Sequence, residues 1–318
     1  RGWASLNKQS AAGIDGVTTK DFEQRLSENI NSTAERLRQN LYRASDVKRV
    51  YIPKSNGKER PLGLPTTEDK LVQQSVSELL QSIWEQDFLP NSYGYRSRKS
   101  AHQAIKSLQL NLQYNRYGYI VEADIKGFFD NMDHAWLMRM LKIRIDDKQI
   151  LNLINQWLKA KIVESGGRKL KPTSGIPQGG VISPILANIY LHYTLDIWFE
   201  KRIKPKLKGN AMLIRYADDF VVAFQYRDEA REFYHELGPR LKKFNLLVAT
   251  DKTSLKRFSR FHPCFENRFT FLWFDFYWDT DYQGYQRVRR RTSRKKHKAS
   301  IKAFNDWIKH NRHRRLDN

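Results

Sequence analysis

The chain has 318 residues, and its 57 Lys and Arg residues against 34 Asp and Glu residues give a formal net charge of +23. So basic a chain points to a polyanionic partner, and a hydrophobic content of 40% excludes a wholly disordered basic tail. Its single cysteine, Cys264, excludes a disulfide framework and a cysteine-rich zinc site. No apolar run is long enough to predict a membrane span.

The N-terminal third carries the pattern of a β-hairpin followed by helices. Residues 46–53 and 60–64 are strand-like runs on either side of a polar turn with Asn56-Gly57 at its tip, a favoured pair for a hairpin turn. Apolar residues recur at helical spacing in 71–83, and residues 100–112 predict a second helix. The hairpin and these helices precede the first strand of chemical interest.

The middle of the chain alternates strands and helices. An apolar strand is predicted at 117–125, ending near Asp124, and a hairpin with Ala217-Asp218-Asp219 at its tip is predicted further on. The order β-α-β-β-α-β between residues 117 and 249 is that of a split βαβ sheet. The other predicted elements are a turn at 174–180, helices at 134–142, 147–160, 182–199 and 228–244, and strands at 211–216, 220–224, 246–249 and 270–276.

Three carboxylates are placed to meet at one edge of this sheet. Asp124 lies at the C-terminal end of its strand, and a split βαβ order makes that strand a neighbour of the hairpin that carries Asp218 and Asp219. Carboxylates gathered there repel one another unless divalent cations hold them. Hard oxygen ligands suit Mg²⁺, and the reaction class that follows is two-metal in-line phosphoryl transfer.

Basic residues are concentrated at the C-terminal end, in residues 285–318. In the same segment Ile301, Phe304 and Ile308 recur at helical spacing beside Trp307, behind the possible cap Ser293. The pattern predicts a basic amphipathic helix, with a disordered basic tail as the alternative.

Several stretches, in one order along almost the whole chain, resemble the reverse transcriptases encoded by group II introns and related bacterial enzymes. The clearest are EADIKGFFDNMDH at 122–134, SGIPQGGVISPILANIYLH at 174–192 and IRYADDFVV at 214–222. The other matching stretches lie at 11–18, 51–66, 91–105, 249–255 and 269–276.

The resemblance implies an α+β right-hand polymerase fold with a split βαβ palm sheet. The implied divisions are fingers at 1–98, palm at 99–130, a fingers insert at 131–173, palm at 174–282, and the beginning of an incomplete helical thumb at 283–318.

The resemblance also implies the roles of the residues around the carboxylates. Asp124, Asp218 and Asp219, with the carbonyl of Ile125, correspond to the ligands of two catalytic Mg²⁺ ions, for which Mn²⁺ is the expected substitute. Phe129 resembles an aromatic gate that excludes a 2′-hydroxyl. The positions that correspond to deoxynucleotide contacts are Lys54, Arg60, Phe129, Gln178 and Lys252.

Nucleic-acid contacts are implied along the same cleft and into the basic segment. Trp273 departs from the family, which usually has glycine in the loop that grips the primer. Core packing is the first expectation for its indole, and stacking on a base or sugar is the alternative. The implied contact residues are Arg96, Gly179, Tyr216, Trp273, Arg289, Arg290, Arg291, Lys295 and Lys296.

The function implied is RNA-directed DNA synthesis, with an RNA template, a DNA or RNA primer and dNTPs as partners. A maturase that binds structured intron RNA is a second reading, and both roles can coexist. Recruitment to a bacterial defence system beside CRISPR adaptation proteins is a third reading. A viral-type RNA-dependent RNA polymerase is a fourth, but it gives no reason for Phe129. We expect a bacterial cytoplasmic protein associated with the nucleoid or with ribonucleoprotein, and no membrane partner.

Overall fold

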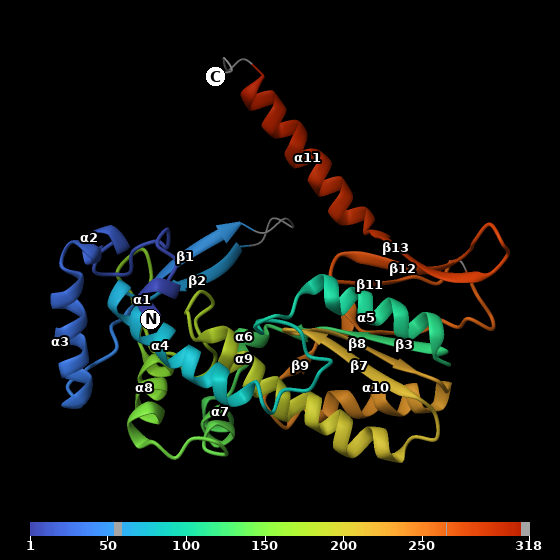
Figure 1. Cartoon of the computed structure of the whole chain (residues 1–318), viewed down its shortest axis with the longest axis horizontal. Coiled ribbons are helices and arrows are strands. Elements are labelled where there is room, and N and C mark those ends of the chain that lie inside the picture. The colour runs from blue at the N-terminus through green and yellow to red at the C-terminus, as the bar shows by residue number, and fades with distance from the viewer. Residues whose placement is uncertain (54–58, 265, 313–318) are drawn as a thin grey trace.

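The computed structural model describes residues 1–53, 59–264 and 266–312. Figure 1 shows helices around a β-hairpin at one end of the molecule and a sheet between helices at the other, with helix α11 rising away from the body. The mixed α+β class predicted from the sequence is confirmed. None of the described helices is long and apolar enough to cross a membrane.

The N-terminal end is built around the predicted hairpin. Strands β1 and β2 pair antiparallel from Lys48 opposite Leu64 to Pro53 opposite Glu59, so the two predicted strands are confirmed. The predicted Asn56-Gly57 tip lies outside the described residues, as does Lys54. The sheet order is β2-β1-β5-β6. The elements here are α1 (Gly2–Ser5), α2 (Thr19–Gln24), α3 (Leu26–Arg38), β1 (Val47–Pro53), β2 (Glu59–Leu64), α4 (Thr67–Trp84), β5 (Ile162–Val163) and β6 (Lys169–Leu170).

The central sheet has the order β10-β3-β8-β7, and all of its pairs are antiparallel. With the intervening helices this is the split βαβ arrangement predicted from the sequence. One strand differs: the edge strand is β10, whereas the predicted strand at 246–249 is the short β9, which pairs with β4 beside the sheet. The elements are α5 (Ala101–Tyr114), β3 (Tyr119–Ala123), β4 (Ile125–Lys126), β7 (Ala211–Tyr216), β8 (Asp219–Phe224), α10 (Arg227–Lys242), β9 (Leu247–Val248), η4 (Thr250–Lys252) and β10 (Ser254–Arg257).

Both faces of this sheet are covered, which explains why its strands are apolar at successive positions. Val121 and Val222 belong to the cluster that includes the buried residues of α10, whereas Ile120 and Ala223 belong to the cluster that includes those of α5. Figure 1 shows α5 above the sheet and α10 below it. The sheet is therefore a rigid floor for whatever its strand ends carry.

Helices between the hairpin and the sheet connect the two ends of the molecule. The predicted helix at 182–199 forms as α9, but it continues through wider π-helical turns to Ile203. The buried polar residues His192, Thr194 and Asp196 all lie in the first of these wide turns. The elements are α6 (Phe128–Asn131), α7 (His134–Leu141), α8 (Lys148–Lys159), α9 (Ser183–Leu191), η1 (His192–Asp196), η2 (Phe199–Ile203) and η3 (Lys204–Lys206).

The C-terminal region forms a further sheet and then the predicted helix. The predicted single strand at 270–276 is wrong, because the chain reverses at Leu272 and Trp273, whose positive φ values of 49° and 70° make a tight hairpin turn. Helix α11 begins at the predicted cap, where the Ser293 hydroxyl accepts from the Lys296 N–H. The elements are β11 (Phe269–Phe271), β12 (Phe274–Thr280), β13 (Gln286–Thr292) and α11 (Arg294–Asn311).

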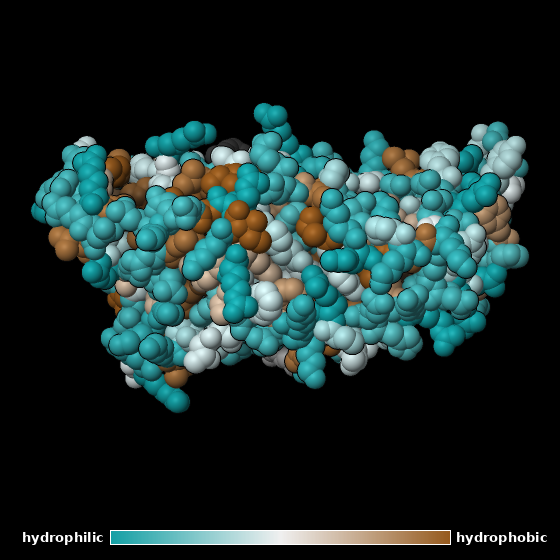
Figure 2. All heavy atoms as spheres, turned by 90° about the horizontal axis from the view of Figure 1, so that it is seen from below, coloured by the Kyte–Doolittle hydropathy of each residue, from teal (hydrophilic) through white to brown (hydrophobic). Residues whose placement is uncertain are grey.

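Helix α11 buries none of its residues against the body. Its apolar residues Phe304 and Trp307 are 61% and 62% exposed, although their rings stack on each other. Figure 2 shows the lower face of the molecule, where teal residues cover most of the surface and apolar residues form separate small groups.

Candidate active site

A cavity of about 520 Å³ opens between the N-terminal hairpin and the edge of the central sheet. Residues from segments far apart in the sequence line it, including two of the three predicted carboxylates. The lining residues that the sequence also predicted are Arg60, Asp124, Ile125, Phe129, Gln178, Gly179, Asp218 and Lys252.

Strand pairing brings the carboxylates to this cavity. Ala123 at the end of β3 pairs with Phe220 in β8, so Asp124 follows directly beside the turn that carries Asp218 and Asp219. Asp218 lines the cavity with Asp124, whereas Asp219 is not among the lining residues. The Asp219 carboxylate instead accepts from the Leu272 N–H at 3.4 Å. The turn therefore directs its two acids to different neighbours.

The turn has an unusual backbone. Ala217 has a φ of +56°, in the left-handed region that residues with a Cβ seldom adopt. Gly94 lies against it so closely that a Cβ there would stand 2.2 Å from the Ala217 nitrogen. The close approach of Gly94 therefore supports the turn from the side of the segment that follows α4.

Asp218 and Asp219 lie where burial disfavours the charged form of their carboxyl groups. Burial raises the pKa of Asp218, and the charge of Asp124 acts in the same direction. Burial raises the pKa of Asp219 to about 7, with Asp124 and Asp218 adding to the shift. Acids whose pKa values are raised by burial and by one another are typical of functional sites, including those that bind a cation.

Lys252 is the cation nearest to Asp124. Its Nζ lies 2.5 Å from Asp124 Oδ2, and this hydrogen bond raises the pKa of the lysine. The Lys252 side chain is 63% exposed, so it is free to leave the carboxylate. Lys252, which the sequence predicted to lie near the site, thus lines the cavity and directs its ammonium group at Asp124.

The donor set fits a hard divalent cation, although the ligands are not yet assembled. Asp124 and Asp218 open onto one cavity, and oxygen donors are what Mg²⁺ prefers. Among the described residues no three acidic, histidine or cysteine side chains already form a metal-binding group. A cation held by Asp124 would compete with Lys252 for that carboxylate.

The opposite wall is made by strand β2 and the turn before α9. The Gly63 N–H donates to the Gln178 carbonyl at 2.7 Å, which holds the two segments together. Gly179 has a φ of +106°, and a Cβ there would stand 3.0 Å from the Gly63 oxygen. Glycine is therefore required at 179 for the wall to close, while Phe129, half-buried, forms the adjacent floor.

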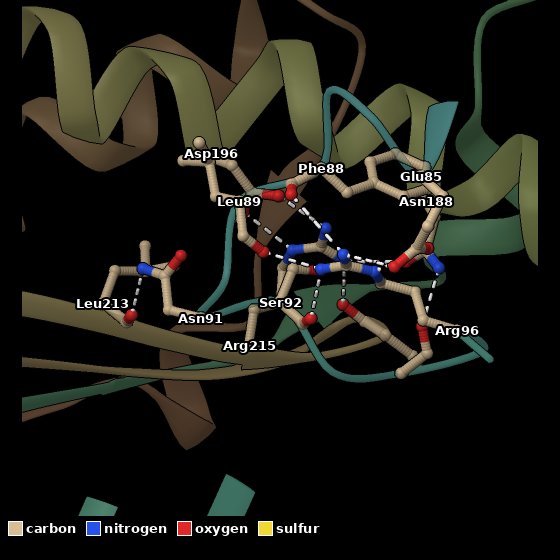
Figure 3. Close-up of polar contacts among 12 residues, drawn as sticks. Glu85, Phe88, Leu89, Asn91, Ser92, Arg96, Asn188, Asp196, Leu213 and Arg215 are labelled. Atoms are coloured by element: carbon tan, nitrogen blue, oxygen red, sulfur yellow. Dashed lines mark hydrogen bonds and ion pairs between the residues drawn. The ribbon is translucent and has the colours of Figure 1, made fainter. Parts of the chain in front are cut away.

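Arg96 is placed differently from the prediction. Its guanidinium, in a side chain only 5% exposed, pairs with Glu85 and donates to the carbonyls of Leu89, Ser92 and Phe88 (Figure 3). A guanidinium whose donors are used inside the protein cannot also contact a phosphate. The predicted nucleic-acid contact at Arg96 is therefore wrong.

Trp273 also differs from the first expectation. Core packing is wrong, because the indole is 55% exposed at the tip of the β11–β12 turn, with Lys296 Nζ 5.6 Å from the ring centroid. Its carbonyl accepts from the Ser293 N–H that begins α11. The turn that contains Trp273 thus contacts Asp219 on one side, through Leu272, and the beginning of α11 on the other.

The other predicted nucleic-acid residues lie on β7, on β13 and at the beginning of α11. Tyr216, half-buried, ends β7 opposite Asp219. Arg289 pairs with Asp279 at 3.1 Å, and Arg291 lies 4.0 Å from Asp275, so aspartates on β12 partly neutralise both. The basic side chains of Arg290, Lys295 and Lys296 are exposed.

One buried network was not foreseen from the sequence. Arg215 forms a bidentate ion pair with Asp196, at 2.8 and 2.6 Å, directly behind the acidic turn (Figure 3). The available signal was the presence of Asn188, His192 and Asp196 in an otherwise apolar helical stretch. Buried polar side chains need partners, and those of Asn188 and Asp196 come from Arg215 on β7 and from Gly94 after α4.

The fold is that of the right-hand polymerase class. The chain matches the family described as "Reverse transcriptase (RNA-dependent DNA polymerase)" over residues 52–286. It therefore belongs to the reverse transcriptase family.

Relatives agree with this membership. "Protein YkfC" of Escherichia coli is 34% identical over 66% of this chain and 62% of its own length. "Group II intron-encoded protein LtrA" of Lactococcus lactis is 38% identical over 60% of this chain and 31% of its own length. The chain thus spans 62% and 31% of the lengths of these two relatives, one of which is encoded by a group II intron.

Solved structures agree on the fold alone. Telomerase from Candida albicans, in complex with a fragment of telomeric RNA, superposes with a TM-score of 0.58 at 14% identity, over 81% of this chain and 48% of that one. The right-hand polymerase fold implied by the sequence is therefore shown.

Proposed function

We propose that this chain catalyses RNA-templated DNA synthesis, adding deoxynucleotides to a DNA or RNA primer. The primer 3′-oxygen attacks the α-phosphorus, the bond from that phosphorus to the bridging oxygen breaks, and pyrophosphate leaves. The hydroxyl proton passes to solvent. Two Mg²⁺ ions, or Mn²⁺ in their place, would supply charge neutralisation at the reacting phosphate, held by Asp124, Asp218, Asp219 and the Ile125 carbonyl.

The observation that carries the proposal is that acidic and basic residues from distant segments of the chain line one cavity. Asp124 and Asp218 lie on one side of it, with Arg60 and Gln178 among the other lining residues. A buried carboxyl with a raised pKa, that of Asp218, lies with Asp124 and the cations Arg60 and Lys252 in one cavity, which is the composition that phosphoryl transfer needs.

The remaining side chains would bind and orient the nucleotide. Arg60 would hold the triphosphate through charge-assisted hydrogen bonds, and Lys252 would join it after leaving Asp124. Lys54 is proposed for the same role from the sequence alone. The Phe129 ring would exclude a 2′-hydroxyl by contact, while Gln178 would lie against the nascent pair.

The template and primer would lie against the basic side of the molecule. Gly179 lines the cavity and Tyr216 pairs with Asp219 at the acidic turn, while Trp273 offers a flat exposed ring on which a base or sugar can stack. Phosphates would meet the exposed cations Arg290, Lys295 and Lys296, with Arg289 and Arg291 beside them. The fingers, palm and thumb divisions given above remain part of this proposal.

A second role, binding of structured intron RNA as a maturase, is favoured by α11, a basic helix that stands clear of the body. The two roles separate in the variant Asp218→Asn with Asp219→Asn. Primer extension is lost, because both neutral side chains bind cations weakly, whereas affinity for structured RNA is kept. Asp251→Asn, an exposed acid beside Lys252, is the matched control.

Extension that survived in the double variant would contradict the polymerase site. Loss of RNA affinity together with extension would contradict a separate RNA-binding role.

A further inference from the structure

Arg215 is completely buried, and each polar contact of its guanidinium points to a part of the catalytic turn or its support. Nε and Nη2 donate to the two oxygens of Asp196, which is 1% exposed. Nη1 donates to Asn188 Oδ1 at 3.0 Å and to the Ala217 carbonyl at 2.9 Å. Figure 3 shows the guanidinium at the centre of these contacts.

The bond to Ala217 reaches the strained residue of the turn. Ala217 has the left-handed φ of +56°, which carries a cost for a residue with a Cβ and persists only when its surroundings enforce it. Its carbonyl is fixed by Arg215, and its nitrogen is pressed against Gly94. Ala217 immediately precedes Asp218, so the direction of the Asp218 carboxylate follows from this backbone conformation.

Asn188 closes the arrangement. Its Oδ1 accepts from Arg215, while its Nδ2 donates to the Gly94 carbonyl at 2.6 Å. The Arg215 backbone is paired as well, because its N–H donates to the Asn91 carbonyl and its carbonyl accepts from the Tyr93 N–H. The Asn188 side chain thus joins helix α9 to strand β7 and to the segment after α4.

A lysine could not replace these contacts. The planar guanidinium offers donors in several fixed directions, whereas an ammonium is a point charge on a flexible stem. Asp196 compensates the buried charge, which leaves the Nη1 group directed at Asn188 and Ala217. The ion pair therefore supplies a neutral, rigid support behind two acids that repel each other.

We propose that Arg215 is a positioning residue for the polymerase site, which fixes the Ala217 carbonyl and thereby the direction in which Asp218 faces the metal and nucleotide cavity. This inference rests on the proposed function, since it assigns Asp218 a cation-binding task. Arg215 itself touches neither substrate nor metal.

The test compares three proteins with the wild type in single-nucleotide incorporation and in Mn²⁺ binding to the nucleic-acid-free protein by calorimetry. The first is the double variant Arg215→Met with Asp196→Leu, because apolar replacement of both members of a buried ion pair often leaves folding intact. Arg215→Lys is the second and keeps the charge. Arg96→Met is the matched control, since it removes a similarly bonded arginine that does not reach the turn.

For both Arg215 variants we expect the Mn²⁺ dissociation constant and the half-saturating Mg²⁺ concentration to rise about tenfold, and kcat to fall about 100-fold. The KM for dNTP changes less than about threefold, since the groups that bind the nucleotide are untouched. Arg96→Met lowers the melting temperature but leaves metal dependence unchanged.

Arg215 variants with wild-type metal affinity and wild-type metal dependence would overturn the proposal, whatever their melting temperature. If the wild type fails to extend any primer, the proposed function is lost, and Mn²⁺ calorimetry alone then decides the role of Arg215: unchanged affinity in both variants overturns it, and a tenfold loss supports it. If the double variant does not fold, Arg215→Lys gives the same decision.

Discussion

Lys252 and Asp124 form an ion pair across the mouth of the cavity, with 2.5 Å between Nζ and Oδ2. The lysine follows β9 and the aspartate follows β3, so the ion pair joins these two segments. Since Asp124 is also the proposed metal ligand, Lys252 and the cation compete for one carboxylate.

Replacing Lys252 by methionine should separate these two effects. Without its competitor Asp124 binds Mn²⁺ about threefold more tightly in the free protein, because an exposed ion pair is weak. The KM for dNTP rises about tenfold, since a phosphate contact is lost. Calorimetry and steady-state extension measure the two changes.

Lys256→Met is the control for that variant. Lys256 forms a similar pair with Glu122 at 2.5 Å, but neither residue lines the cavity. A KM for dNTP that rises equally in both variants, or in neither, contradicts the role of Lys252.

Phe129 should set the preference for deoxynucleotides. The half-buried ring lines the cavity, so Phe129→Ala opens space for a 2′-hydroxyl and lowers discrimination against ribonucleotides about tenfold or more. Phe129→Tyr keeps the ring and should keep the discrimination. The ratio of kcat/KM for dNTP and rNTP measures this. An unchanged ratio in Phe129→Ala assigns the gate elsewhere.

Trp273 should contribute to nucleic-acid binding but little to folding. Its side chain is 55% exposed, so Trp273→Ala changes the free energy of unfolding by less than about 0.5 kcal/mol. Loss of a stacking surface weakens primer-template binding about tenfold. Tyr282→Ala is the control, because this ring is 94% exposed in the other turn of the sheet. Fluorescence anisotropy measures the affinities, and equal losses in both variants would argue against a specific site.

Metal binding should depend on pH through Asp219. Burial raises its pKa to about 7, so the carboxyl is protonated below that value in the metal-free protein and must lose its proton to bind a cation. The apparent affinity for Mg²⁺ therefore rises from pH 6 to pH 8.

The same shift affects stability. A raised pKa in the folded state means that the folded chain holds a proton that the unfolded chain has lost, so stability falls as pH rises from the ordinary aspartate range through about 7. Asp219→Asn removes this loss and raises the melting temperature at pH 8 by a few degrees in metal-free buffer. Calorimetric scans of both proteins at pH 6 and pH 8 measure it, and a change in melting temperature between the two pH values that is equal in the wild type and in Asp219→Asn contradicts the assignment.

Local pattern was enough to predict the elements that carry the site. The strand before Asp124 and the hairpin around Asp218 are short apolar runs with an acidic end, and such runs bounded by turns indicate buried strands. Ser293 as the cap of α11 is equally local. The edge strand β10 was missed because SLKR is short and half polar, as edge strands often are.

Long-range contacts decided the rest. Nothing local tells a phosphate-binding arginine from Arg96, whose donors meet carbonyls that only the folded chain brings together. Arg215 is invisible for the same reason, since its partners are Asp196, Asn188 and Ala217. The exposure of Trp273 was not predictable either, because this apolar residue lies within a strand-like run of the sequence but at the tip of a turn in the structure.

The most direct test of the whole account is extension of a DNA primer on an RNA template with Mg²⁺ and dNTPs, by the wild type, by Asp124→Ala and by Asp251→Ala. The account predicts extension by the wild type and by Asp251→Ala, and a loss of about 1,000-fold in Asp124→Ala with RNA affinity kept. Extension by Asp124→Ala at the wild-type rate would contradict the central claim that this carboxylate holds the catalytic cation.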